Sequence, residues 1–136
     1  MNNDQNDTLD LQERAKTEKH GTFIICNQSH DTLEKIYLTH SRNNYLPEEY
    51  TLSGCKSLEV TEAKEFNYIT GSGSPFDYWH IKVETEEGIF ETKSNFYCSV
   101  KDSDDGNVLI VIIMGKSGGN AYFYFSDSSS CSVGLN

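Results

Sequence analysis

From Gly21 onward, hydrophobic and polar residues alternate with a period of two, which is the spacing of a β-strand that buries one face. The alternation is clearest at 78–84. There Trp79, Ile81 and Val83 lie on one side, and the residues between them lie on the other. This pattern is typical of a half-buried antiparallel strand, and it predicts that Trp79 faces the core.

Several other short segments are rich in β-forming residues and are separated by turn residues. The expected strands are 22–27, 33–39, 58–60, 65–70, 89–93, 96–100, 108–114 and 121–125. We interpret 41–50 as a polar loop and 126–136 as a small, polar tail. No helical pattern separates the strands, so the sequence predicts an all-β chain that folds as a single antiparallel β-sandwich of about eight short strands.

Three segments carry more specific predictions. Apolar residues occupy both faces of 108–114, which predicts a central strand. The Asp-Gly pair at 105–106 predicts a tight hairpin before it, because glycine accepts the positive φ that such turns need. The segment 121–125 alternates tyrosine with phenylalanine, so either Tyr122 and Tyr124 or the two phenylalanines must face outward.

The N-terminal residues differ from the rest of the chain. Residues 1–20 are mostly polar or charged, and only Leu9, Leu11 and Ala15 could share one face of a helix. We therefore expect a flexible polar arm at 1–20, with room for a short helix, followed by one β-sandwich domain at 21–136. The length of 136 residues fits a single domain with its own core.

The chain is strongly acidic, with a net charge of −10 and a pI of about 4.7. Nucleic-acid binding requires cationic side chains that neutralise phosphates, so we expect no nucleic-acid partner. An anionic membrane is disfavoured for the same reason. The polar N-terminus predicts no signal peptide, and no apolar run is long enough to span a bilayer. We expect a protein that stays in the cytoplasm or is released by a non-classical route.

The sequence lacks the common catalytic and metal-binding motifs. The histidines are isolated, no CxxC pair occurs, and no GxSxG segment is present. The acidic stretch 102–107 departs from the spacing of a calcium loop, so we interpret it as a solvated turn. The glycines at 71 and 73 precede a strand and not a helix, which argues against a phosphate-binding loop. We therefore expect no enzyme activity, no metal and no cofactor.

The four cysteines leave two states open. Because no secretion signal is expected, we expect Cys26, Cys55, Cys98 and Cys131 to be reduced, buried thiols. A Cys98–Cys131 disulfide is conceivable if the protein enters an oxidising compartment. The sequence does not decide between these two states.

Aromatic residues are the main candidates for a binding surface, because they make up 12% of the chain and a strand buries only one of its faces. Tyrosine and tryptophan combine an apolar ring with a polar tip, which suits membrane and protein interfaces. The candidate contact residues for a lipid or protein partner are Phe76, Tyr78, Trp79, His80, Tyr122 and Tyr124. The alternation favours a core position for Trp79, so Tyr78 is the first surface candidate.

This short acidic chain has regularly spaced predicted strands. Near its middle lie the turn TGSG at 70–73 and the aromatic segment FDYW at 76–79. In these features, the region of about 21–126 resembles the aegerolysins, a family of small acidic β-sandwich proteins. The resemblance implies a non-enzymatic protein that recognises neutral or sphingolipid-containing membranes and acts with a pore-forming, toxin-related partner.

A competing hypothesis rests on the charge. An acidic domain could neutralise or escort a basic protein partner, as immunity and anti-defence proteins do. The acidic clusters at 48–49, 84–87 and 102–105 would then steer the association electrostatically. The oligomeric state does not follow from the sequence.

Overall fold

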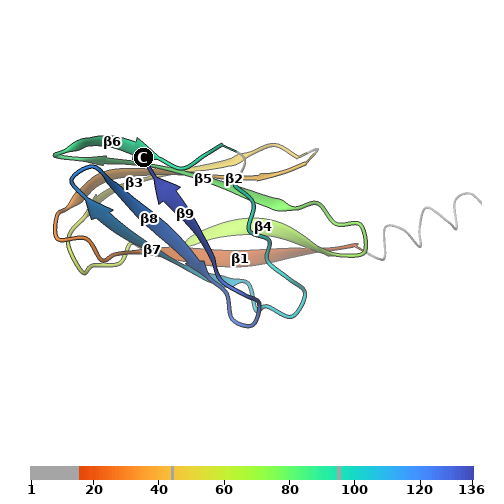
Figure 1. Cartoon of the computed structure of the whole chain (residues 1–136). Coiled ribbons are helices and arrows are strands. Elements are labelled where there is room, and N and C mark those ends of the chain that lie inside the picture. Colours follow the sequence, from red (N-terminus) through yellow and green to blue (C-terminus); the bar gives the residue numbers. More distant parts are fainter. Residues whose placement is uncertain (1–15, 44, 95) are drawn as a thin grey trace, which may run out of the picture.

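The chain folds into nine strands arranged in two sheets (Figure 1). The computed structural model describes residues 16–43, 45–94 and 96–136, and no helix occurs within these ranges. The five-stranded sheet has the order β4 (Lys64–Gly71), β1 (Lys16–Asn27), β7 (Asn107–Gly115), β8 (Gly118–Tyr124) and β9 (Cys131–Leu135). The four-stranded sheet has the order β3 (Glu48–Cys55), β2 (Leu33–Arg42), β5 (Asp77–Thr85) and β6 (Gly88–Glu91). The predicted all-β fold class is confirmed.

The hydrophobic core lies between the two sheets. Alternate residues of β1 and β7 enter it from one sheet, and Trp79, Ile81 and Val83 of β5 enter it from the other. The ring of Phe23 in β1 packs edge-on against Trp79, with ring centroids 6.4 Å apart. Trp79 is only 1% exposed, so its predicted place in the core is confirmed.

The two sheets curl towards each other and are joined at both sides. At one side, the N–H groups of Glu91 and Asn136 each donate to the other residue's carbonyl, at 3.0 and 3.1 Å. A disulfide between Cys98 and Cys131 adds a covalent link from the segment after β6 to β9, while Cys26 and Cys55 are free thiols. The arrangement is therefore only roughly the open sandwich that the sequence predicts.

The opposite side is joined by side chains from β3 to the backbone of β4. The hydroxyl of Tyr50 donates to the carbonyl oxygen of Glu65 at 2.6 Å. The carboxylate of Glu48 accepts the N–H of Asn67 at 3.1 Å. Both contacts occupy backbone groups at the edge of β4, which protects this edge from pairing with another chain. We call this side the β3–β4 seam.

The sheets are not purely antiparallel, which corrects the prediction. β1 and β7 lie side by side in parallel, with Ile24 opposite Leu109. β7 is the central strand of its sheet, as its apolar residues on both faces predict. The predicted hairpin at 105–106 is wrong. Gly106 does turn the chain with φ of 86°, but its carbonyl oxygen accepts the N–H of Thr22. The strand that follows, β7, therefore pairs with β1.

Strand prediction fails mainly where the strands are polar. β3 covers part of the predicted loop at 41–50, and β9 lies in the predicted polar tail. The predicted strand at 58–60 contributes only a single bridge from Val60 to Cys26. The segment 96–100 alternates as expected, yet it forms only one bridge, from Tyr97 to Tyr78.

The start of the ordered sheet also differs from the predicted domain boundary. β1 begins at Lys16, so residues 16–20 of the predicted arm pair with β4. The remainder of that arm, 1–15, including the predicted short helix, lies outside the described residues. Within the described ranges, no helix is long and apolar enough to cross a membrane.

The carboxylate of Asp104 ties the loop before β7 to the loop between β8 and β9. One oxygen accepts the N–H groups of Asp127 and Ser128, and the other accepts the N–H of Lys101 and the hydroxyl of Ser128, at 2.6–2.9 Å. Burial raises the pKa of this carboxyl, but the hydrogen bonds together outweigh burial and lower the pKa. Asp104 is 6% exposed, so the prediction of a solvated turn is wrong at this residue.

We predict that Asp104→Asn lowers the free energy of unfolding by about 2 to 3 kcal/mol at neutral pH, because an amide nitrogen replaces one accepting oxygen. Because folding lowers the pKa of Asp104, its carboxylate stabilises the protein above the unfolded pKa of about 4 and loses this effect as the pH falls through the folded pKa. In urea denaturation, the difference in the free energy of unfolding between wild type and variant should therefore become smaller below about pH 4.

The control is Asp31→Asn, which changes an exposed aspartate in the turn between β1 and β2. This variant should unfold like the wild type at every pH. The assigned role of the carboxylate would be contradicted if the difference in the free energy of unfolding between the wild type and Asp104→Asn stayed constant in acid.

Candidate functional site

The predicted contact residues lie on opposite outer faces of the molecule, so the structure does not bring them all together (Figure 1). Tyr78 and His80 point outward from β5, in the four-stranded sheet. Tyr122 and Tyr124 point outward from β8, in the five-stranded sheet, while Phe123 between them is fully buried. His80 lies 3.4 Å from the carboxylate of Glu91 and is partly covered.

The structure corrects the predicted set of contact residues at Trp79. Its indole is buried among core rings, and its Nε1–H donates to the carbonyl oxygen of Cys98 at 2.8 Å. The polar tip that would suit an interface is therefore satisfied inside the protein. Trp79 does not reach the surface, and its prediction as a contact residue is wrong.

An exposed aromatic stack lies where β5 begins. The rings of Phe76 and Tyr97 stack with centroids 5.5 Å apart, and the two residues are 52% and 61% exposed. Tyr78 packs edge-on against Tyr97 at 6.3 Å. The prediction missed Tyr97, although the alternation at 96–100 would have placed it opposite the buried Phe96 and outward.

The loop between β2 and β3 adds apolar side chains at the same end of the sheet. Arg42 pairs with Asp77 in the β-ladder, so the residues after Arg42 and before Asp77 leave the sheet together. Tyr45 is 46% exposed and Leu46 is 89% exposed. We call this end of the four-stranded sheet the aromatic end; the aromatic and apolar residues there are Tyr45, Leu46, Phe76, Tyr78 and Tyr97.

Two shallow depressions adjoin the aromatic end. One, of about 330 Å³, runs along the turn at 71–75, and the other, of about 440 Å³, runs towards the disulfide. Both are lined by Phe76, Ser99 and Lys101. The two depressions therefore share an aromatic, a hydroxyl and a basic residue, and each also has an acidic residue, Asp102 in the first and Asp127 in the second.

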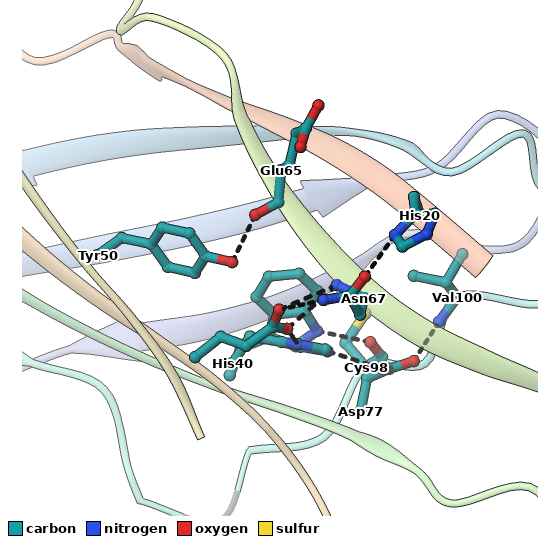
Figure 2. A network of polar contacts seen from close by, with 10 residues as sticks. His20, His40, Tyr50, Glu65, Asn67, Asp77, Cys98 and Val100 are labelled. Carbon is teal, nitrogen blue, oxygen red and sulfur yellow. Dashed lines mark hydrogen bonds and ion pairs between the residues drawn. The ribbon is translucent and has the colours of Figure 1, made fainter. Parts of the chain in front are cut away.

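A buried polar network holds the aromatic end in place, starting at the residue after Phe76 (Figure 2). The carboxylate of Asp77 accepts the N–H of Val100 at 3.0 Å, and the N–H of Asp77 donates to the hydroxyl of Ser99 at 3.1 Å. The N–H of Cys98 donates to the carbonyl oxygen of Asp77 at 3.0 Å. These bonds fix the segment that carries Tyr97 against the start of β5.

The centre of the network is His40 of β2. Its Nδ1 lies 2.8 Å from the Glu48 carboxylate, and its Nε2 lies 2.7 Å from the Asp77 carboxylate. The ring is 1% exposed and packs against Phe66 and Trp79, with ring centroids 5.0 and 4.5 Å away. Both ring nitrogens are therefore engaged in hydrogen bonds to side-chain carboxyl groups from two other strands.

The network continues from Glu48 into the other sheet. The second oxygen of the Glu48 carboxylate accepts the side-chain amide of Asn67 in β4, at 2.9 Å. The Asn67 carbonyl oxygen in turn bonds Nδ1 of His20 in β1 (Figure 2). The chain of polar contacts therefore crosses the β3–β4 seam and links both sheets.

The geometry of His40 favours a structural role over a catalytic one. Both ring nitrogens already bond carboxylates, so neither nitrogen has a free lone pair for general-base catalysis. No group of three or more potential metal ligands occurs in the part of the chain that the structure describes. In the sequence His40 is only an isolated histidine, and the structure buries its ring in the core.

We predict that His40→Leu lowers the free energy of unfolding by about 3 to 5 kcal/mol, because it leaves the buried Asp77 carboxyl group and the partly buried Glu48 carboxyl group without their hydrogen-bond partner. His80→Leu is the matched control, since His80 lies on the neighbouring strand with its partner Glu91 half exposed. That variant should change stability by about 0.5 kcal/mol or less. If urea denaturation shows that the two variants lose the same free energy of unfolding, a stabilising role for the network is ruled out.

The chain was also compared with known proteins. No protein-family model matches it, and no curated protein matches it either. These comparisons neither support nor oppose the resemblance to aegerolysins, which stays a prediction.

Proposed function

We propose that this chain is a non-enzymatic binding protein that attaches to neutral, zwitterionic or sphingolipid-containing membranes through its aromatic end. The observation that carries the proposal is the exposed stack of Phe76 and Tyr97. In this proposal, the two curled sheets act as one β-sandwich scaffold, and the sphingolipid target and the pore-forming partner follow from the resemblance to aegerolysins.

The composition of the aromatic end supports this target. Tyrosine rings are favoured where one end of a side chain is apolar and the other is wet, as at a membrane surface. Leu46 and Phe76 add apolar area that lacks a cover in the described chain. The stack is fixed by the network around Asp77, so binding needs little further ordering of these side chains.

The depressions beside the stack support a zwitterionic headgroup. Lys101 supplies a cation for a phosphate, and the rings of Phe76 and Tyr97 supply faces for a quaternary ammonium. The net charge of −10 disfavours lipids that carry only negative charge. Neutral, zwitterionic lipids therefore fit the surface better than anionic lipids.

The alternative, an acidic module that escorts a basic protein, draws less support. Of the acidic residues at 102–105, Asp104 is buried and bonded internally, and Asp102 lies 2.8 Å from the ammonium of Lys19. The hydrogen bond from Lys19 lowers the pKa of Asp102, as expected for a carboxylate already engaged. Fewer carboxylates remain to steer a partner than the sequence implies.

The disulfide bears on where the protein works. Disulfides persist in oxidising compartments and are rare in the reducing cytosol. The Cys98–Cys131 bond therefore favours release from the cell over a cytoplasmic location. This location agrees with a target on a membrane surface, and it is part of the proposal.

We predict that the protein sediments with vesicles of phosphatidylcholine and sphingomyelin, and only weakly with vesicles rich in phosphatidylserine. Phe76→Ala and Tyr97→Ala should each weaken binding about five- to tenfold, because each removes about 1 to 1.4 kcal/mol of apolar burial. Vesicle sedimentation with quantified bound fractions measures both effects.

Ile89→Ala is the matched control for these variants. Ile89 is 61% exposed, but it lies in β6, paired with Glu84 near the opposite end of β5. This variant should bind like the wild type. If the wild type binds no vesicle, or if Ile89→Ala weakens binding as much as Phe76→Ala, the proposed membrane role fails; salt-sensitive capture of a basic protein instead would favour the alternative.

A further inference from the structure

A separate depression lies on the outer face of the five-stranded sheet, away from the aromatic end. Its volume is about 410 Å³. Ile24, Leu109 and Tyr124 form its floor, side by side on β1, β7 and β8. Leu109 is 37% exposed and Tyr124 is 44% exposed, so the floor presents apolar surface to solvent.

The depression is polar at one end only. One pleat along from the apolar floor, the hydroxyl of Thr22 donates to the side-chain oxygen of Asn107 at 2.8 Å. Asp105 and Ser126 complete this end, and the N–H of Asp105 donates to the Ser126 hydroxyl at 2.7 Å. An apolar floor with a polar end is the arrangement that an amphiphilic ligand requires.

Among the described residues, no cationic side chain pairs with the carboxylate at the polar end. Oδ1 of Asp105 accepts the N–H of Asn107 at 2.9 Å, which lowers the pKa of the carboxyl and keeps it ionised. The ion pairs between described residues involve other carboxylates, and none of them includes Asp105. A ligand with a cationic head would supply the missing counter-charge beside the apolar floor.

We propose that this depression binds a small cationic amphiphile, with a protonated amine against Asp105 and an apolar chain across Ile24, Leu109 and Tyr124. The charge selects against a carboxylate head, and the apolar floor selects against a small polar amine. The inference does not depend on the proposed membrane role, because the two surfaces belong to different sheets.

Three probes with the same apolar chain test the head group: octylamine, octanol and octanoate. Binding is followed by the backbone amide shifts of the protein in NMR titrations. We expect octylamine to bind about three- to fivefold more tightly than octanol, as a partly exposed ion pair allows, and octanoate to bind most weakly. The shifts should be largest around Leu109 and Asn107.

Two variants, each with a matched control, separate the contribution of the Asp105 charge to binding from that of the apolar floor. Asp105→Asn keeps an oxygen that can accept the N–H of Asn107, and it should abolish the preference for octylamine over octanol. The control Asp31→Asn should keep the preference. Leu109→Gln should weaken all probes about fivefold, because it places an amide on the floor. Its control is Ile113→Gln, since Ile113 is 41% exposed on the same strand but does not line the depression.

Several results would overturn the proposal. Equal affinity of octylamine and octanol for the wild type would show that Asp105 selects no cation. A preference that survives in Asp105→Asn would place the selective charge elsewhere. Shifts that map to the aromatic end, or concentration-dependent dimer formation through this face, would show that the depression has another occupant.

Discussion

The burial of an imidazole between two carboxyl groups is the constraint on which the rest of this structure depends. An ion taken out of water costs several kcal/mol unless its partners are close and well oriented. His40, Glu48 and Asp77 come from three different strands, so β2, β3 and β5 must hold their register to within a fraction of an ångström to meet this condition. An apolar core would tolerate small slips that this network does not.

The same network determines which parts of the surface are rigid. Asp77 binds the segment before the loop at 101–106, and Glu48 binds the edge of β4. The exposed rings at the aromatic end therefore sit on a scaffold anchored from within the core. The depression over Leu109 has a different basis, because its floor is part of a regular β-ladder.

The sequence predicts the apolar strands well because alternation alone determines their two faces. His40 and Asp77 also occupy inward positions of this alternation. His40 follows the inward Ile36 and Leu38, and Asp77 precedes the inward Trp79 by two residues. Alternation does not reveal them, because a polar residue in a strand is ordinarily exposed. β3 and β9 were missed for another reason, since their pairing partners, and not their own composition, make them strands.

The parallel contact between β1 and β7 has a consequence for how the chain reaches this fold. Thr22 and Asn107, which bond each other there, are 85 positions apart. The backbone must lose the entropy of closing that long loop before the central pair of the sheet forms. Chains dominated by such distant pairings fold slowly, on a scale of about milliseconds to seconds. During that interval the apolar β7 stays uncovered, so the yield of refolding should depend on protein concentration.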